Sequence, residues 1–151
     1  MLLEKEIFQK KFRNNYHKLA VNLIYTTNWL NAHFRKSFEK HDITLQQYNI
    51  LRILRGYSPS PATLNFLKER MLDKMSDASR LVERLRKKGI VQRTLNKKDR
   101  REVEVIITSK GLNILKKLDP VQKKADKLLF SLSAREASTL NKLLDKLRSH
   151  K

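Results

Sequence analysis

Residues 76–108 read SDASRLVERLRKKGIVQRTLNKKDRREVEVIIT, and the spacing of apolar residues in this stretch changes at Gly89. Before the glycine, apolar residues recur at helical spacing, which predicts an amphipathic helix over 76–88. After it, the apolar residues follow an extended pattern, which predicts strands over 90–95 and 102–108. The polar residues between the strands are expected to form the tip of a β-hairpin.

The predicted helix has start and stop signals at its two ends. Ser76 is expected to be the N-cap, and Asp77 would favour the positive N-terminal end of the helix dipole. Gly89 is expected to follow the last turn, where glycine commonly ends a helix. Val82 and Leu85 should face inward, so the arginine and lysine residues of this helix should face solvent.

Further helices are expected before this stretch. Residues 4–40 carry apolar residues at spacings of three, four or seven, which predicts one long amphipathic helix. Thr44 and Gln47 fit a capping box that opens a second helix, and Gly56 with the prolines after it is expected to end that helix. Pro61 suits the first position of a third, short helix, because proline is common there.

The chain after residue 108 is also expected to be helical. A leucine stripe begins at Leu112, and Pro120 either starts a new helix or kinks a continuous one. Ser133 and Glu136 fit a second capping box, which would open the last helix.

The order of these elements, in which three short helices precede a two-stranded hairpin, is typical of a winged helix-turn-helix. The sequence therefore predicts a mainly α fold with a small β-hairpin wing and long N- and C-terminal helices. An α-helix about 10–12 Å across fits the major groove of DNA, which is about 12 Å wide. A hairpin beside such a helix could reach the adjacent minor groove or the phosphate backbone.

The charge of the chain favours a polyanionic partner. Lysine and arginine total 34 against 15 aspartate and glutamate residues, which gives a formal net charge of +19. Ten of these bases and two of the acids lie between Arg80 and Arg101, a net charge of +8. DNA, RNA and an anionic membrane surface all attract such a charge. The density of bases on the predicted helix and hairpin tip favours DNA over a merely solvated charged face.

Composition and motifs disfavour several other classes. Without cysteine, the chain has no disulfides, thiolate catalysis or usual zinc fingers. His17, His33, His41 and His150 are never three or four positions apart, so no helical metal pair is expected. No catalytic carboxylate pair, phosphate loop or nucleophile–base pair stands out, so neither an enzyme nor a cofactor is expected. No apolar run reaches roughly 20 residues and no secretory signal pattern opens the chain, so we expect a cytoplasmic protein without a membrane partner.

The stretch quoted above resembles the MarR family of winged-helix regulators. The similarity lies in the helix segment Asp77–Leu85, the glycine turn Lys87–Val91, the Asp-x-Arg element Asp99–Arg101, the strand end Val105–Thr108 and the helix start Lys110–Gly111. These motifs occur in register, and the order of the helices extends the resemblance over nearly the whole chain.

The resemblance implies which residues contact DNA. The expected recognition-helix contacts are Ser76, Asp77, Ser79, Arg80 and Arg84. The expected wing contacts are Lys97, Lys98, Asp99, Arg100 and Arg101. The start of the recognition helix would face the bases, and Arg84 would meet phosphate. In the wing, Asp99 would hold Arg101 in the minor groove, whose negative potential is enhanced where the groove is narrow.

The resemblance also implies a homodimer and a ligand. Residues 1–151 would form one domain, with a helical dimerisation region at 1–40 and 112–151 and a DNA-binding lobe at 44–110. The dimer would bind a pseudo-palindromic operator on double-stranded DNA. A small aromatic or anionic effector would bind in a cleft between the dimer helices and the lobe. The residues expected to line that cleft are Tyr16, His17, Tyr25, Trp29 and His33.

These expectations lead to one main function and one alternative. The main function is a sequence-specific, ligand-responsive, homodimeric transcription regulator that acts as a repressor. The alternative is a non-specific architectural protein that binds DNA or RNA, because the net charge supports both functions. The cysteine-based peroxide sensing of one branch of the family is excluded, because the chain has no cysteine.

Overall fold

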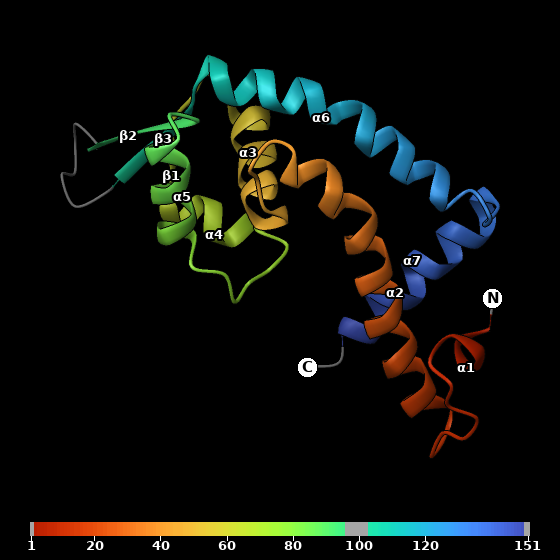
Figure 1. The fold of residues 1–151 in the computed structure, drawn as a ribbon. Helices are drawn as coiled ribbons and strands as arrows, with labels where there is room; N and C mark the ends of the chain where they lie inside the picture. Colours follow the sequence, from red (N-terminus) through yellow and green to blue (C-terminus); the bar gives the residue numbers. More distant parts are fainter. Residues whose placement is uncertain (1, 96–102, 150–151) are drawn as a thin grey trace.

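The computed structural model describes residues 2–95 and 103–149, and it confirms a mainly helical chain with a small antiparallel sheet (Figure 1). The helices are α1 (Leu3–Glu6), α2 (Asn15–Glu39), α3 (Leu45–Tyr57), α4 (Leu64–Arg70), α5 (Ala78–Lys87), α6 (Ser109–Leu128) and α7 (Ala134–Arg148). The strands are β1 (Ala62–Thr63), β2 (Val91–Leu95) and β3 (Val103–Ile107). The succession α3, α4, α5, β2 and β3 is the predicted winged helix.

The sheet has the strand order β1–β3–β2, and both strand pairs are antiparallel. β2 and β3 form the predicted hairpin, in which Val91 pairs with Ile107 and Leu95 with Val103. β1 was not predicted, because a two-residue strand is too short to show a sequence pattern. Its Ala62 pairs opposite the middle of β3, so β1 covers the edge of β3 that β2 leaves open.

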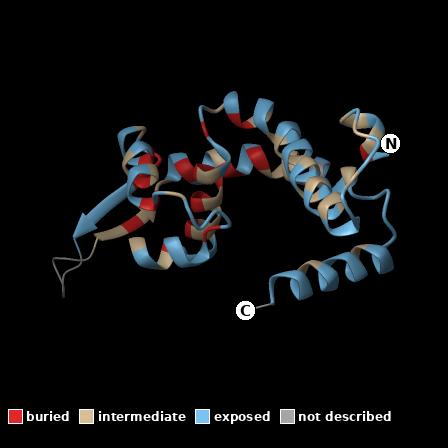
Figure 2. Cartoon of the chain, turned by 90° about the horizontal axis from the view of Figure 1, so that it is seen from below, coloured by how far each residue is buried: buried red, intermediate tan, exposed pale blue. Residues whose placement is uncertain are grey.

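The hydrophobic core of the lobe surrounds α3. Ile50, Leu51 and Leu54 of this helix are completely or almost completely buried. They belong to one cluster that also contains Leu67 of α4, Val82 and Leu85 of α5, Val105 of β3, and Leu115 and Leu118 of α6. Figure 2 shows the buried residues gathered in this lobe, whereas the helices beyond it carry few. The lobe therefore positions α5 and the hairpin through a shared core.

The remaining helices extend away from the lobe. α2 and α6 leave it in the same general direction, and α7 turns back from the end of α6 (Figure 1). Phe38, next to the lobe, is buried in α2, but none of the residues of α7, all of which are described, is buried. A single chain therefore leaves the apolar stripe of this region in contact with water. None of the described helices is both long and apolar enough to cross a membrane.

The prediction of one helix over residues 4–40 was wrong, because the chain forms the short α1 and begins α2 only after Asn14. The Asn14 side chain caps α2 by accepting a hydrogen bond from the backbone N–H of His17 at 2.9 Å. Phe8 has a φ of 54° and is 94% exposed, so it is not part of a buried helical face. The apolar spacing continued across the break and concealed it.

Two other helix starts differ from the prediction. Pro61 does not open α4, because residues 62–63 are extended in β1 and the Thr63 side chain caps the helix. Asp77 is the N-cap of α5 in place of Ser76. Serine and aspartate are about equally good N-caps, so residue preference alone could not separate these neighbours.

The predicted capping boxes are confirmed, but Gly56 does not end its helix, because α3 continues through it to Tyr57 and ends just before Pro59. Both capping boxes form, one between Thr44 and Gln47 and the other between Ser133 and Glu136. α6 runs through Pro120 as a single helix, so of the two alternatives the continuous helix is the one observed.

Candidate nucleic-acid interface

α5 presents two different faces. Val82 and Leu85 are fully buried against the core, whereas Ser79, Arg80 and Arg84 are exposed on the other side. Neither Arg80 nor Arg84 makes a side-chain hydrogen bond or ion pair with another described residue. Their guanidinium groups are therefore free to meet an anion from outside.

The start of α5 is fixed by carboxylates. Asp77 accepts a hydrogen bond from the backbone N–H of Arg80 at 3.0 Å. The hydroxyl of Ser76 donates to the carboxylate of Asp73 at 2.7 Å, and this bond is the main cause that lowers the pKa of Asp73. Ser76 and Asp77, both predicted as DNA contacts, thus hold the turn and the helix start. The side chain of Ser79 makes no hydrogen bond with a described residue.

Glu83 lies on the exposed side of α5 and binds two arginines. Arg86 donates from Nε and Nη2 to the two carboxylate oxygens, at 2.9 and 2.8 Å. Arg93 reaches the same carboxylate from β2, with Nη1 at 3.5 Å from Oε2. The hydrogen bond from Arg86 is the main reason why the pKa of Glu83 is lowered to about 2. The carboxylate is therefore ionised at neutral pH and links α5 to β2.

The turn from α5 into β2 places the wing relative to the helix. Gly89 has a φ of 68° and lies in a Schellman motif, where its N–H donates to the Arg86 carbonyl and the Ile90 N–H to the Leu85 carbonyl. Thr108, at the end of β3, has its hydroxyl 2.9 Å from the carbonyl oxygens of both Gly89 and Ile90. α5, the hairpin and the start of α6 therefore meet at one corner.

The predicted wing contacts lie outside the described residues. They are Lys97, Lys98, Asp99, Arg100 and Arg101. Leu95 and Val103, between which this segment runs, pair with each other as the last described residues of the hairpin. The wing-tip roles stay predictions.

A cavity of about 720 Å³ lies between α2, α3, α6 and the loop from α4 to α5. Phe34, Phe38 and Tyr48 contribute aromatic rings to its lining, and Arg52 and Gln122 contribute polar groups. The Phe34 and Phe38 rings stack with centroids 5.7 Å apart, and Tyr48 stacks on Phe38 at 4.7 Å. The cavity thus lies where the long helices meet the lobe, and it combines an aromatic wall with a cation.

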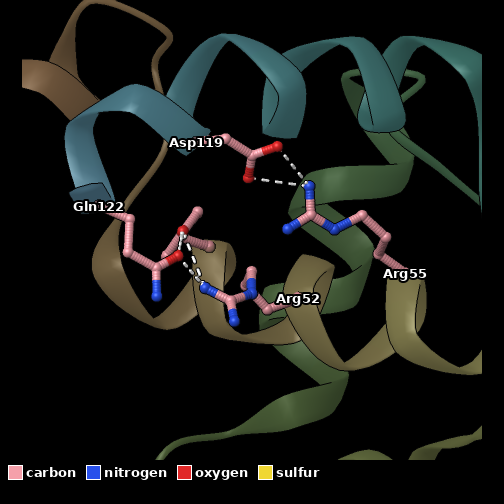
Figure 3. A network of polar contacts seen from close by, with 5 residues as sticks. Arg52, Arg55, Asp119 and Gln122 are labelled. Atoms are coloured by element: carbon pink, nitrogen blue, oxygen red, sulfur yellow. Dashed lines mark hydrogen bonds and ion pairs between the residues drawn. The ribbon is translucent and has the colours of Figure 1, made fainter.

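A polar network joins α3 to α6 beside this cavity (Figure 3). The Tyr48 hydroxyl donates to Oε1 of Gln122 at 2.9 Å, and Arg52 donates to the same oxygen. One turn further along α3, Nη1 of Arg55 lies 2.9 Å from both carboxylate oxygens of Asp119. Arg52 is among the described residues that line the cavity, whereas Arg55 and Asp119 are not.

The residues predicted to line a ligand cleft lie elsewhere on α2, and none of them is among the described residues around this cavity. Those residues were Tyr16, His17, Tyr25, Trp29 and His33. Tyr25 donates a hydrogen bond of 2.7 Å to Glu6 of α1. Trp29 packs edge to face on His33, with ring centroids 4.7 Å apart. Tyr16 and His17 lie in the opening turn of α2, which begins at Asn15.

The fold and the corner that joins an exposed basic helix to a hairpin define a winged-helix protein. The sequence profile of the MarR family matches residues 43–103. A MarR transcription factor from Planctomyces limnophilus is 31% identical to the chain, with a TM-score of 0.67, and the match covers 89% of this chain and 98% of that one. The protein belongs to the MarR family of transcription regulators.

Two further solved structures share the fold at lower identity. S. aureus MepR in a complex with DNA has a TM-score of 0.78 at 19% identity, and the match covers 93% of this chain and 100% of that one. The PcaV transcriptional regulator from Streptomyces coelicolor, solved with its natural ligand, has a TM-score of 0.80 at 16% identity, with 93% and 99% covered. A comparison with curated protein sequences found no match.

Proposed function

We propose that this protein is a homodimeric repressor that binds a pseudo-palindromic operator and releases it on binding a small aromatic or anionic ligand. The observation that carries the proposal is the exposed face of α5, where Arg80 and Arg84 have no partner among the described residues. MepR, which shares the fold, was solved in a complex with DNA. This protein would bind DNA with the corresponding helix.

α5 is the element that would enter the major groove. Ser79 and Arg80 lie in its first turn, so their side chains would reach the base edges, and an arginine can donate two hydrogen bonds to O6 and N7 of guanine. Arg84 lies one turn later and would meet phosphate. The predicted wing contacts, with Arg101 held by Asp99, would add the minor groove.

Selection of bound duplexes from a random DNA library at about 150 mM salt tests this function. We expect a palindrome whose half-sites lie about 10 base pairs apart, because a two-fold dimer presents two α5 helices one turn of DNA apart. Tight binding without any enriched motif would instead favour the non-specific architectural function, since counterion release binds all sequences alike. Absence of duplex binding would contradict the proposed function and the DNA-binding form of the alternative.

Dimerisation would cover apolar residues that a single chain leaves exposed. Leu140, Leu143 and Leu147 of α7 recur at helical spacing and are 45%, 58% and 48% exposed. An exposed apolar stripe of this kind is typical of a surface that another chain covers. The dimerisation region would comprise residues 1–40 and 112–151, and the DNA-binding lobe residues 44–110.

The cavity beside α3 is the proposed ligand site, in place of the residues first predicted on α2. Its stacked rings of Phe34, Phe38 and Tyr48 suit a flat aromatic molecule. Arg52 supplies a cation at the wall, which favours an anionic substituent such as a carboxylate. PcaV, which shares the fold, was solved with its natural ligand. A ligand that takes Arg52 from Gln122 would change the contact between α3 and α6.

Arg52→Gln is expected to weaken the binding of aromatic carboxylates about tenfold or more, because a hydrogen bond to a charged group contributes about 1.5–3 kcal/mol. Benzoate and its hydroxylated derivatives are suitable probes, and the rise in melting temperature on adding each compound is the measurement. Arg55→Gln is the matched control, because Arg55 pairs with Asp119 and is not among the described lining residues. A panel in which neutral phenols bind and no carboxylate does would contradict the anionic ligand class.

A further inference from the structure

Glu83 is an acidic residue within the most basic described part of the chain, where binding to a polyanion would favour bases only. Between Arg80 and Leu95, where every residue is described, it is the single acid among six bases. It lies on the exposed side of α5, the side proposed to face DNA. A carboxylate there repels phosphate and weakens the attraction of the helix to DNA. Glu83 must therefore have another role.

The geometry around Glu83 supplies that role. Arg86 from α5 holds both of its oxygens side-on, and Arg93 from β2 approaches one of them, so two elements meet at one carboxylate. The side chains of Glu83 and Arg93 are 33% and 31% exposed, and that of Arg86 is 48% exposed. The cluster is thus anchored at the junction of recognition helix and wing and still open to solvent.

The two arginines keep donors for an outside anion. A guanidinium group has five N–H donors. Glu83 takes two from Arg86 and one from Arg93, and the other donors have no partner among the described residues. Long side chains that are already held lose less rotational freedom when they bind, which favours the bound state.

We propose that Glu83 is a positioning residue, which holds Arg86 and Arg93 as a pre-organised pair that binds the DNA phosphate backbone between the recognition helix and the wing. The inference rests on the proposed function, because it requires α5 to lie on DNA. Partly exposed ion pairs contribute little to folding, so the expected effect of Glu83 is on DNA binding and not on stability.

Glu83→Gln separates positioning from simple electrostatics, because the two predict opposite signs. The substitution raises the net charge by one, so electrostatics alone predicts tighter binding to every duplex. Positioning predicts about tenfold weaker binding to the selected duplex, because base contacts hold the protein in one register there and bring the pre-organised pair against a fixed phosphate. On a scrambled duplex no single register is held, so binding should be unchanged or tighter. The ratio of the two affinities, measured at about 150 mM salt, should therefore fall about tenfold or more.

Glu69→Gln is the matched control, because Glu69 is an exposed acid beside an arginine on α4 and the change in charge is the same. Its affinity ratio should equal that of the wild type. Glu83→Asp, which keeps the carboxylate, should restore part of the lost ratio. In a chain that already carries Arg86→Gln and Arg93→Gln, adding Glu83→Gln should change the ratio by less than about twofold, because the residues it positions are gone.

The outcomes distinguish this inference from the function on which it rests. A wild-type protein that does not prefer its selected duplex over a scrambled one would overturn the proposed function and the inference together. If the wild type prefers its selected duplex and the Glu83→Gln variant prefers it equally or more strongly, the inference alone is overturned. A further loss on adding Glu83→Gln to the double arginine variant would also overturn it, because Glu83 would then act without the arginines. Equal melting temperatures establish that the variants compared are folded.

Discussion

Replacing Gly111 by alanine is expected to lower the free energy of unfolding by about 3 kcal/mol and the melting temperature by about 6–12 °C. A Cβ atom at this position would lie 2.5 Å from the carbonyl oxygen of Ile90 and 2.7 Å from Cγ1 of Ile107. The first of these contacts is with backbone, which cannot rotate away. α6 would have to move off the corner where it meets α5 and the hairpin. Thermal unfolding at a fixed protein concentration measures the effect.

Gly56→Ala is the matched control for this substitution. Gly56 lies inside α3, and nothing lies within 4 Å of the place where its Cβ would be. Alanine there is expected to leave the free energy of unfolding unchanged or to raise it by about 0.5–1 kcal/mol, because glycine is unfavourable in a helix interior. A Gly111→Ala variant that unfolds at the wild-type temperature would show that the close approach to Ile90 does not require glycine.

Gly111 also illustrates how much of the lobe could be predicted. The signals of the lobe are local. They are a capping box at Thr44, a glycine stop at Gly89, and the change of the apolar spacing from helical before Gly89 to extended between Gly89 and Thr108. Each acts over a few residues, so each could be predicted without knowing the fold. The position of Gly111 could be matched to a family motif in the same way. The reason why glycine is needed there could not be predicted, because the Ile90 carbonyl that excludes a side chain comes from a different part of the chain.

The errors arose where two local signals compete or where a pattern hides a break. Ser76 and Asp77 both suit an N-cap, and only the bond from Ser76 to Asp73 in the preceding loop leaves the cap to Asp77. The apolar spacing over residues 4–40 is regular, but the left-handed backbone at Phe8 ends the regular helix there. Spacing reports which residues could share a face and does not report whether the helix is continuous.

The cavity could not be predicted because segments that are separated in the sequence form it, namely α2 with α3, the loop from α4 to α5, and α6. Arg52 of α3 and Gln122 of α6 are 70 positions apart and share a hydrogen bond. No spacing in either helix marks that contact. Aromatic residues on α2 were the available signal, and it favoured residues nearer the start of the helix than the Phe34 and Phe38 that line the cavity. Residue type led to the prediction of an aromatic lining, whereas packing between the helices determines where the cavity lies.

Leu143→Asp is expected to convert the proposed dimer into monomers and to weaken binding to the selected palindrome about 100-fold or more. Leu143 is the most exposed leucine of the α7 stripe, at 58%, so an aspartate there does not disturb the core of a single chain. In a dimer interface it would bury an unpaired charge, which is strongly unfavourable. A monomer contacts one half-site, and the binding free energy from the second is lost. Sedimentation equilibrium and titration with the palindrome measure the two effects.

Ser138→Asp introduces the same charge on the opposite face of α7 and is the matched control. It should remain dimeric and bind the palindrome as the wild type does, because Ser138 lies half a turn away from the leucine stripe. A Leu143→Asp variant that stays dimeric would contradict the assignment of α7 to the interface. A variant that is monomeric but binds the palindrome with full affinity would contradict the proposal that the operator is recognised by two lobes together. The size of the loss also tests α5, because a second half-site contributes to affinity only if each lobe contacts its own half of the palindrome.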